Sequence, residues 1–483
     1  KRTVATDGIN GLTLAGNAGV NDSMRLNFTG DNAVLLSAVD LIDVNLGGDA
    51  SDDLIVLVSG IDVTVTFNTA QNGIITVETL SIPFTGLGQN TLTVDGAQDL
   101  TLTLSSDATN LVFTAGATPG FTRVTGTNVA TTQFVNPTGS LIVNLGTTST
   151  ATFTSMDPGF NPSGGIQVNG GTGDNSITFT SLGSGFSGPV TVTGNGGTDS
   201  VVFNGTLQAG SLNVQSESIQ LNGASLTTTG GAITFNGPVS LGTAASTLNS
   251  SGGNIAFQST VSGSQNLVLA AGIGSGTTTF TGAVSNLGTV VGPALTVQNG
   301  VTGLVYFQSS LSGNSGLQAT GSGSNLRFDG DVTLGDGGSG TNLAGNVRLD
   351  GLTWSGYDGL SFGTVTLSGG PVSINSNSSA LAFTGTVNGT QNLTLTAGTG
   401  NIDFDAAVGL SDRLGILTIV SAANLTADAA VQAASITQQA GSGTTTLSSA
   451  VNTNAAGGVS ITGNNLALNG GLTTTAAGVF TTS

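Results

Sequence analysis

The stretch that decides the fold is QNLTLTAGTGNIDFDAAV, residues 391–408. Apolar residues alternate with polar ones on both sides of an AGTG turn, first at Leu393 and Leu395 and then at Ile402 and Phe404. A period of two places the apolar side chains on one face of a strand and the threonines on the other. The glycines of the turn supply the positive φ that a tight corner needs. The stretch therefore predicts two short strands joined by a turn.

A pentapeptide related to the FDAAV of this stretch recurs along the chain. It consists of an aromatic residue or Leu, any residue, Gly, Ser or Ala, any residue, and Val or Leu. From Phe235 onward, most neighbouring copies are about 21 to 23 residues apart, a period that suits a solenoid turn and is too short for a propeller blade. The copies begin at Phe203, Phe235, Phe257, Phe280, Phe307, Phe328, Phe383, Phe404 and Leu447.

The longest gap between copies, from Phe328 to Phe383, is divided by Phe362 into intervals of 34 and 21 residues. Stacked rungs of one length would place Phe over Phe and Thr over Thr along the axis. Each backbone N–H would then bond to a carbonyl of the adjacent rung. We expect the phenylalanines to fill the core of this stack.

The composition agrees with an all-β chain. Of 483 residues 77 are Gly and 9 are Pro, and only 7% are charged, against about 25% in typical domains. Glycine at this density, among Asn, Ser, Thr and Asp, predicts many turns. The Val, Ile and Thr residues between the turns predict short strands. Helical patterning is nearly absent.

The charge and the missing residue types exclude several classes of function. The formal net charge is −19 with seven Lys and Arg residues, so no basic stripe can form and we predict no nucleic-acid partner. No apolar run reaches about 18 residues, which predicts no membrane insertion. The chain has no Cys and no His, which removes disulfides, thiol nucleophiles and the commonest general base. We expect an exported, processed or partial chain whose targeting signals lie elsewhere.

Regularity differs along the chain. We predict an irregular all-β region over residues 1–160, made of diverged rungs or of a separate β-domain, and regular β-solenoid repeats over residues 161–483. The first region holds longer apolar runs, such as AVLLSAVDLIDVNL from Ala33. The stretch MDPGFNPSGG, residues 156–165, is the best loop or linker candidate, because Pro and Gly together punctuate strands.

The phrase QNLTLTAGTGNIDFDAAVG and its relatives at Gln265 and Phe235 resemble filamentous-haemagglutinin-like exoproteins. The chain also looks like the very large bacterial surface proteins described as β-strand-repeat proteins. The resemblance covers Phe203–Ser483 clearly and the earlier part loosely. It implies a right-handed parallel β-helix, secretion, and a role in adhesion or fibre formation. The secretion domain of two-partner exoproteins is not recognisable at residues 1–30, which leaves the export route open.

A second pattern is typical of calcium-binding turns. GGDASDDL (47–54) and GGTGDNSI (170–177) approximate G-G-x-G-x-D-x-hydrophobic, the second with Asn175 in the Asp position, and GNGGTDSVV (194–202) fits more loosely. Glycine turns expose carbonyls and Asp adds a hard oxygen ligand, which suits Ca²⁺. The copies are isolated rather than tandem, so ordinary Asp/Gly turns are the alternative. Calcium is the one cofactor considered, and none is predicted to be required. The candidate ligands are Asp52, Asp53 and Asp174.

Some β-helices act on polysaccharides, and hydrolysis needs two positioned carboxylates. The nearest candidates are Asp329, Asp331 and Asp336 beside Arg327 and Arg348. An Asp/Arg cluster on a solenoid is usually a solvated ladder, and no residue elsewhere completes a catalytic site. We therefore predict that the chain is not an enzyme.

Trp354 and Tyr357, in TWSGYDG, make the only concentrated aromatic patch of the sequence. Such a patch can stack on a sugar, although filling a wide rung is the favoured interpretation.

These observations together predict a secreted structural fibre or matrix protein of a bacterial cell surface. Open strand edges at uncapped terminal rungs would pair with copies of the same chain, end to end or side by side. The alternative is the stalk of a large adhesin that contacts surface glycans. A polysaccharide-active β-helix is the third hypothesis.

Overall fold

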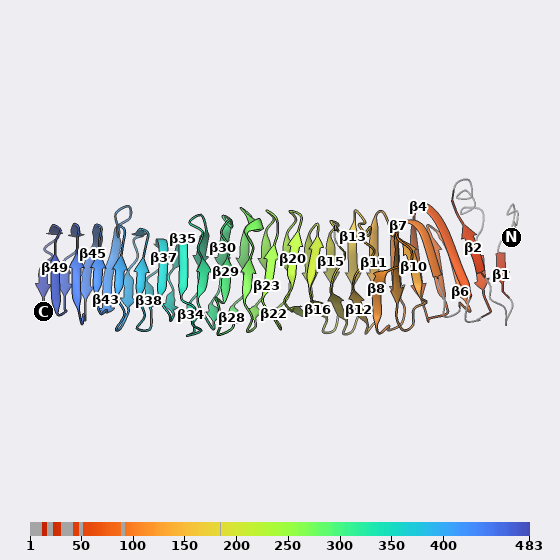
Figure 1. Cartoon of the computed structure of the whole chain (residues 1–483), viewed down its shortest axis with the longest axis horizontal. Helices are drawn as coiled ribbons and strands as arrows, with labels where there is room; N and C mark the ends of the chain where they lie inside the picture. Colours follow the sequence, from red (N-terminus) through yellow and green to blue (C-terminus); the bar gives the residue numbers. More distant parts are fainter. Residues whose placement is uncertain (1–11, 17–22, 30–41, 48–51, 88–91, 184) are drawn as a thin grey trace. The chain divides into compact units, whose positions relative to one another are not determined.

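The computed structural model describes residues 12–16, 23–29, 42–47, 52–87, 92–183 and 185–483 (Figure 1). The regular structure of these residues is almost entirely short β-strands, and their only helix is the 3₁₀ turn η2 (Ala271–Ile273). Most strands pair in parallel with a strand one rung away, so the fold is a β-solenoid with rungs of about 22 residues, as the repeat predicts. The chain divides into two compact units, residues 1–237 and 238–483.

In the second unit the strand segments stack in register on equivalent segments of neighbouring rungs and form three parallel columns. One rung consists of β24 (Ile255–Phe257), β25 (Val261–Ser262) and β26 (Leu267–Leu269), and β27 (Thr278–Phe280) begins the next rung directly on β24. Inward residues of these strands are buried and the residues between them are half-exposed. The period-two alternation of the sequence therefore directs apolar side chains into the core from all three sides of the rung.

We name each column after its first strand. The β22 column contains β22 (Val239–Leu241), β25, β28 (Val284–Leu287), β31 (Leu311–Gly313), β34 (Val332–Leu334), β36 (Thr353–Ser355), β38 (Val372–Asn375), β41 (Leu393–Thr396), β43 (Leu414–Ser421), the C-terminal half of β45 (Val431–Gln438), β48 (Val459–Ile461) and β51 (Phe480–Thr482). The β23 column contains β23 (Ser246–Asn249), β26, β29 (Leu295–Val297), β32 (Leu317–Ala319), the N-terminal halves of β35 (Thr341–Asp350) and β37 (Leu360–Ser368), β39 (Leu381–Phe383), β42 (Ile402–Phe404), β44 (Leu425–Ala427), β46 (Thr444–Leu447) and β49 (Asn465–Leu468). The β24 column contains β24, β27, β30 (Leu304–Phe307), β33 (Asn325–Phe328), the C-terminal halves of β35 and β37, β40 (Val387–Asn388), the bridging residue Val408, the N-terminal part of β45, β47 (Val451–Thr453) and β50 (Leu472–Thr474).

The first unit uses the same parallel stacking. Its β11 column contains the C-terminal halves of β4 (Asp53–Phe67) and β7 (Leu92–Leu104), then β11 (Ser140–Asn144), β13 (Gly165–Asn169), β15 (Val190–Thr193), β18 (Leu212–Gln215) and β21 (Ile233–Phe235). Its β12 column contains β8 (Leu111–Ala115), β12 (Thr150–Phe153), β14 (Ser176–Phe179), β16 (Ser200–Phe203) and β19 (Ser218–Leu221). Shorter parallel stacks are β17 (Thr206–Ala209) with β20 (Ser225–Thr228), β1 (Leu12–Ala15) with β3 (Ile42–Asn45) and β6 (Leu80–Thr85), and β2 (Ser23–Asn27) with the N-terminal halves of β4 and β7 and with β10 (Thr132–Val135).

The amino-terminal part is less regular, as predicted, and two antiparallel strands contribute to this. The strand β5 (Gly73–Val77) runs antiparallel to both β4 and β6. Likewise β9 (Phe121–Thr125) runs antiparallel to both β8 and β10. Each excursion joins its neighbours through short turns rather than a full rung, and so the 22-residue period is lost in these segments.

Phenylalanine side chains stack along the core, as the repeat predicts. In the second unit the rings of Phe257, Phe280, Phe307 and Phe328 are parallel within 7°, with neighbouring centroids 4.6–5.0 Å apart. In the first unit Phe113, Phe153, Phe179 and Phe203 stack in the same way at 4.5–5.4 Å. The stacking follows from the register, because parallel rungs place equivalent side chains directly over one another.

The phenylalanine row does not continue across the 34-residue interval. The residue stacked on Phe328 is Leu349, in the β24 column, whereas Phe362 belongs to the β23 column and stacks on Leu343. Trp354, from the β22 column, lies between the two rows, edge-on to Phe328 at 5.0 Å and to Phe362 at 5.2 Å. An interval of 34 residues is about one and a half rungs, so the aromatic position moves to another side of the stack.

A similar change occurs in the first unit. Phe203 is followed in its column by Leu221, whereas Phe235 stacks on Val214 in the β11 column. The pentapeptide copies at Phe203 and Phe235 therefore occupy different sides of the rung.

The loop Met156–Gly165, the loop or linker candidate of the sequence, packs into the core of the first unit. Met156 and Phe160 are buried, and the Phe160 ring stacks on that of Phe186 at 6.0 Å. Asp157 is buried with its carboxylate satisfied, since Oδ1 accepts from Gly159 N–H and Asn136 Nδ2 and Oδ2 accepts from Gly120 N–H, at 2.7–3.0 Å. The segment is therefore a structured loop that fills one side of its rung.

Candidate functional site

The turns that lead into the β12 column carry a ladder of polar side chains. Asn175 Oδ1 accepts a hydrogen bond from the Ser149 N–H at 3.0 Å, and Asp199 Oδ1 accepts one from the Asn175 N–H at 2.8 Å. Glu217 Oε2 accepts in turn from the Asp199 N–H at 3.0 Å. Each side chain therefore satisfies a backbone donor of the preceding rung, at a corner where no strand partner is present. The four residues stand one position before β12, β14, β16 and β19.

Asp199 is the one ladder carboxylate that is completely buried, and its Oδ2 has no hydrogen-bond partner. Glycines enclose this oxygen, because a Cβ on Gly194 would lie 2.5 Å from it and a Cβ on Gly170 would lie 3.2 Å from it. Burial raises the pKa of the Asp199 carboxyl, the backbone and the side chain of Asn175 lower it, and the negative charges of Glu217 and Asp174 raise it, so that the pKa lies above its ordinary value. The charged form of Asp199 is therefore disfavoured in the folded protein.

The predicted calcium ligands belong to turns of different strand stacks. Asp52 is buried immediately before β4 and Asp53 is the half-buried first residue of that strand. Asp174 is exposed in the turn before β14, and its Oδ1 accepts a hydrogen bond from the Thr198 N–H at 2.7 Å. Within the described ranges no three carboxylates come together in a group that could hold a metal ion. The calcium hypothesis stays a prediction.

Asp199 lies in GNGGTDSVV, the looser match to the glycine pattern, but it was not among the candidate ligands. The signal was present, because GTGDNS and GGTDS align so that Asn175 and Asp199 both directly precede a strand beginning with Ser. Only the structure shows that these two positions stack in parallel register and that Asp199 is completely buried.

The Arg/Asp cluster expected in the second unit forms on the outer face of the β24 column. Tyr306, Arg327 and Arg348 occupy the same register position on three successive rungs. Arg327 holds Asp329 in a two-point ion pair at 2.6 and 2.8 Å, and its guanidinium lies 4.6 Å from the centre of the Tyr306 ring. Asp350 contacts both arginines, at 3.2 and 3.3 Å. The hydroxyl of Tyr306 donates to Asp329, which raises the pKa of that phenol.

The three candidate catalytic carboxylates do not form a pair. Asp329 is held by Arg327, and Asp331 Oδ1 accepts a hydrogen bond from the Thr353 N–H at 2.8 Å. Asp336 is exposed in the loop after β34. The ion pairs of Arg327, Arg348, Asp329 and Asp350 form a ladder across successive rungs, the arrangement that was the favoured interpretation of this cluster.

The aromatic patch is divided between the core and the surface. Trp354 is fully buried between Phe328 and Phe362, and its Nε1–H has no partner. Tyr357, three residues later, is 40% exposed. Trp354 therefore fills a wide rung, as favoured, and its ring is not available to stack on a sugar.

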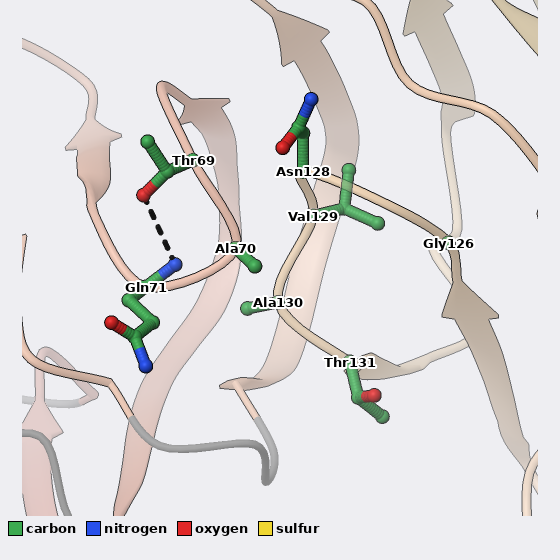
Figure 2. Close-up of a pocket in the computed structure, with 8 residues that line it drawn as sticks. All are labelled: Thr69, Ala70, Gln71, Gly126, Asn128, Val129, Ala130 and Thr131. Atoms are coloured by element: carbon green, nitrogen blue, oxygen red, sulfur yellow. Dashed lines mark hydrogen bonds between the residues drawn. The ribbon is translucent and has the colours of Figure 1, made fainter.

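A hollow of about 490 Å³ lies in the first unit between the turn that joins β4 to β5 and the loop that joins β9 to β10 (Figure 2). One side is formed by Thr69, Ala70 and Gln71 and the other by residues 126 and 128–131. In Figure 2 the methyl groups of Ala70 and Ala130 point into the space between the two segments. The two antiparallel excursions that make this unit irregular thus also create its hollow.

Comparison with known proteins assigns no family. No protein-family model matches the chain, and no curated protein shows significant sequence similarity to it. The fold places the chain in a class, the β-solenoid repeat proteins. Over the part of the chain that the structure describes, no helix has both the length and the apolar character required to cross a bilayer.

Proposed function

We propose that this chain is a structural subunit of an extracellular bacterial fibre or matrix and that it associates with copies of itself. The observation that carries the proposal is that each rung is bonded chiefly to the rungs beside it, through backbone ladders and stacked aromatic rings. The stability of such a stack is approximately the sum of the contributions from each rung and from each contact between neighbouring rungs. The stack can therefore become longer without needing a wider core. These are the properties that a fibre subunit requires.

Amide ladders on the outside of both units support the proposal. Asparagine side chains donate to asparagine side chains of the preceding rung, as stacked identical residues do in fibrous β-structures. The donor–acceptor distances are 2.7–3.0 Å for Asn169 to Asn144, Asn222 to Asn204, Asn236 to Asn213, Asn346 to Asn325 and Asn424 to Asn401.

Self-association is supported by the in-register stacking of equivalent strands along each column. A rung of a second copy has the same width and register, so it can pair with a rung of the first through the same kind of backbone hydrogen bonds.

Electron microscopy of the purified chain at neutral pH, with and without calcium, tests this function. We expect filaments many times longer than one molecule, with an axial repeat of about 4.8 Å from stacked strands. Particles that stay monomeric in sedimentation at every concentration and in both buffers would rule out self-association. The comparison between buffers also tests the predicted role of calcium.

The adhesin alternative is favoured by the polar hollow of Figure 2, which a purely structural subunit does not require. We propose no enzymatic activity, in keeping with the ion-paired state of Asp329. Turnover on a panel of polysaccharides that Asp329→Asn or Asp331→Asn abolishes would overturn that part of the proposal.

A further inference from the structure

We infer that the hollow between the β4–β5 turn and the β9–β10 loop is a binding site for a neutral sugar residue. The inference develops the glycan-binding alternative by naming its site and the class of its ligand. It does not depend on fibre formation, because the hollow is formed by residues of the first unit alone.

The frame of the hollow is held by its own hydrogen bonds. On one side Thr69 Oγ1 accepts from the N–H groups of Gln71 and Asn72, both at 3.2 Å. On the other side Asn128 adopts a left-handed conformation, with φ of 58°, and its Nδ2 donates to the carbonyl of Asp107 at 2.7 Å. The site is therefore formed before a ligand arrives, which lowers the entropic cost of binding.

The lining combines neutral polar groups with a small apolar surface. Gln71 is exposed and carries an amide that can both donate and accept, Asn128 adds an amide oxygen, and Thr131 adds a hydroxyl. Val129 and Ala130 are buried beneath these groups. Sugars present hydroxyls that donate and accept, together with apolar C–H faces, so this mixture is complementary to them. The volume falls in the range of about 300–1,000 Å³ found for small-molecule sites.

The absence of charge in the lining selects against other ligands. None of the eight described residues that line the hollow is ionisable, in a chain whose net charge is −19. An anion would meet no cationic partner in such a site, and a metal ion would meet no carboxylate. A wholly apolar ligand would cover amide groups without satisfying them, which is costly. A neutral, hydroxyl-rich ligand avoids all three penalties.

Two substitutions remove the proposed contacts: Gln71→Ala keeps the hydrogen bonds of the frame, whereas Asn128→Gly also removes the bond to the Asp107 carbonyl. Gln71→Ala deletes the amide, while the backbone N–H of that residue keeps its bond to Thr69 and its carbonyl keeps the bond from the Leu87 N–H. Asn128→Gly deletes the second amide at a position where glycine tolerates the positive φ. Gln308→Ala, at an exposed glutamine of the second unit, is the matched control.

The experiment is ligand-observed NMR and calorimetry on the purified full chain with glucose, galactose, N-acetylglucosamine and, as the charged comparison, glucuronate. We expect at least one neutral sugar to bind, glucuronate to bind more weakly, and Gln71→Ala and Asn128→Gly each to weaken binding about tenfold or more while Gln308→Ala does not. No binding of any neutral sugar at about 10 mM, or binding that neither substitution changes, overturns the inference. Filament formation recorded on the same samples separates this outcome from a failure of the structural role.

Discussion

Replacing Asp199 with Asn should stabilise the protein at neutral pH, although it removes a native carboxylate from a hydrogen-bonded ladder. Asp199 Oδ1 uses its acceptor capacity on the Asn175 N–H, but Oδ2 is buried without any donor. Asn175, one rung earlier, shows what an amide does at this position. Its Oδ1 accepts from the preceding rung and its Nδ2 donates to the Gly173 carbonyl at 2.7 Å.

The magnitude follows from these contacts. A buried acceptor without a partner costs about 1–3 kcal/mol, and a regained hydrogen bond contributes about 0.5–1.5 kcal/mol. In Asp199→Asn the amide keeps the Oδ1 bond and removes the unpaired charged oxygen. Its Nδ2 can donate to the carbonyl two residues earlier, as that of Asn175 does. We expect the free energy of unfolding at pH 7 to rise by about 1–3 kcal/mol.

The raised pKa of Asp199 determines how the effect of the substitution on stability changes with pH. Because the folded-state pKa of Asp199 is raised above 3.8, the protonated carboxyl contributes stability that is complete below pH 3.8. That contribution is lost as the pH rises through the raised pKa, and it stays lost at neutral pH. The advantage of Asp199→Asn should therefore be small in acid, grow above pH 3.8, and become constant above the folded-state pKa.

Urea unfolding of the wild type and the variant from pH 3 to pH 8, with hydrogen exchange of the 194–203 segment as a local readout, measures this difference. Asp157→Asn is the control of opposite sign, because that buried carboxylate accepts three hydrogen bonds and loses acceptors when it becomes an amide. If Asp199→Asn is less stable than the wild type at pH 7, or if its advantage does not change with pH, the reasoning about the unpaired Oδ2 is refuted.

Three further substitutions test the packing of the solenoid by urea unfolding. Trp354→Ala should cost about 3–5 kcal/mol because it leaves a large cavity between the two phenylalanine rows, whereas Trp354→Phe, which also removes the unpaired Nε1–H, should cost much less; equal losses would contradict this packing. Arg413→Lys should destabilise by about 1–2 kcal/mol, because the guanidinium bonds to Ala433, Gln432 and Asn452 on two successive rungs and an ammonium cannot span them. An unchanged unfolding midpoint would show that these hydrogen bonds do not contribute to stability. Gly165→Ala should destabilise by more than about 1 kcal/mol, since its φ is 76° and a Cβ would lie 1.8 Å from the Pro189 carbonyl oxygen, whereas Gly471→Ala, with open space, should be nearly neutral.

The candidate sites were less predictable than the fold. The Arg327–Asp329 cluster could be found from sequence, because residues two apart on a strand share a face. Its stacking on Arg348 and Tyr306 depends on the register between rungs. The hollow of Figure 2 gave no sequence signal, since its two sides are about 60 residues apart and meet only through the antiparallel excursions of β5 and β9.

The sequence by itself determined the strand class, the rung length and the identity of the core residues. These properties are local, because period-two alternation and glycine turns act within one rung, and the 21-residue spacing of Phe383 and Phe404 measures one rung directly. Only the tertiary structure decided in which of the three columns each aromatic residue lies. It moved the aromatic row from Phe328 to Phe362 by way of Trp354, and it buried Asp199 beneath a corner where Asp174 is exposed. The physical reason is that the column of a residue depends on the lengths of all the corner loops before it. A single repeat does not contain that information.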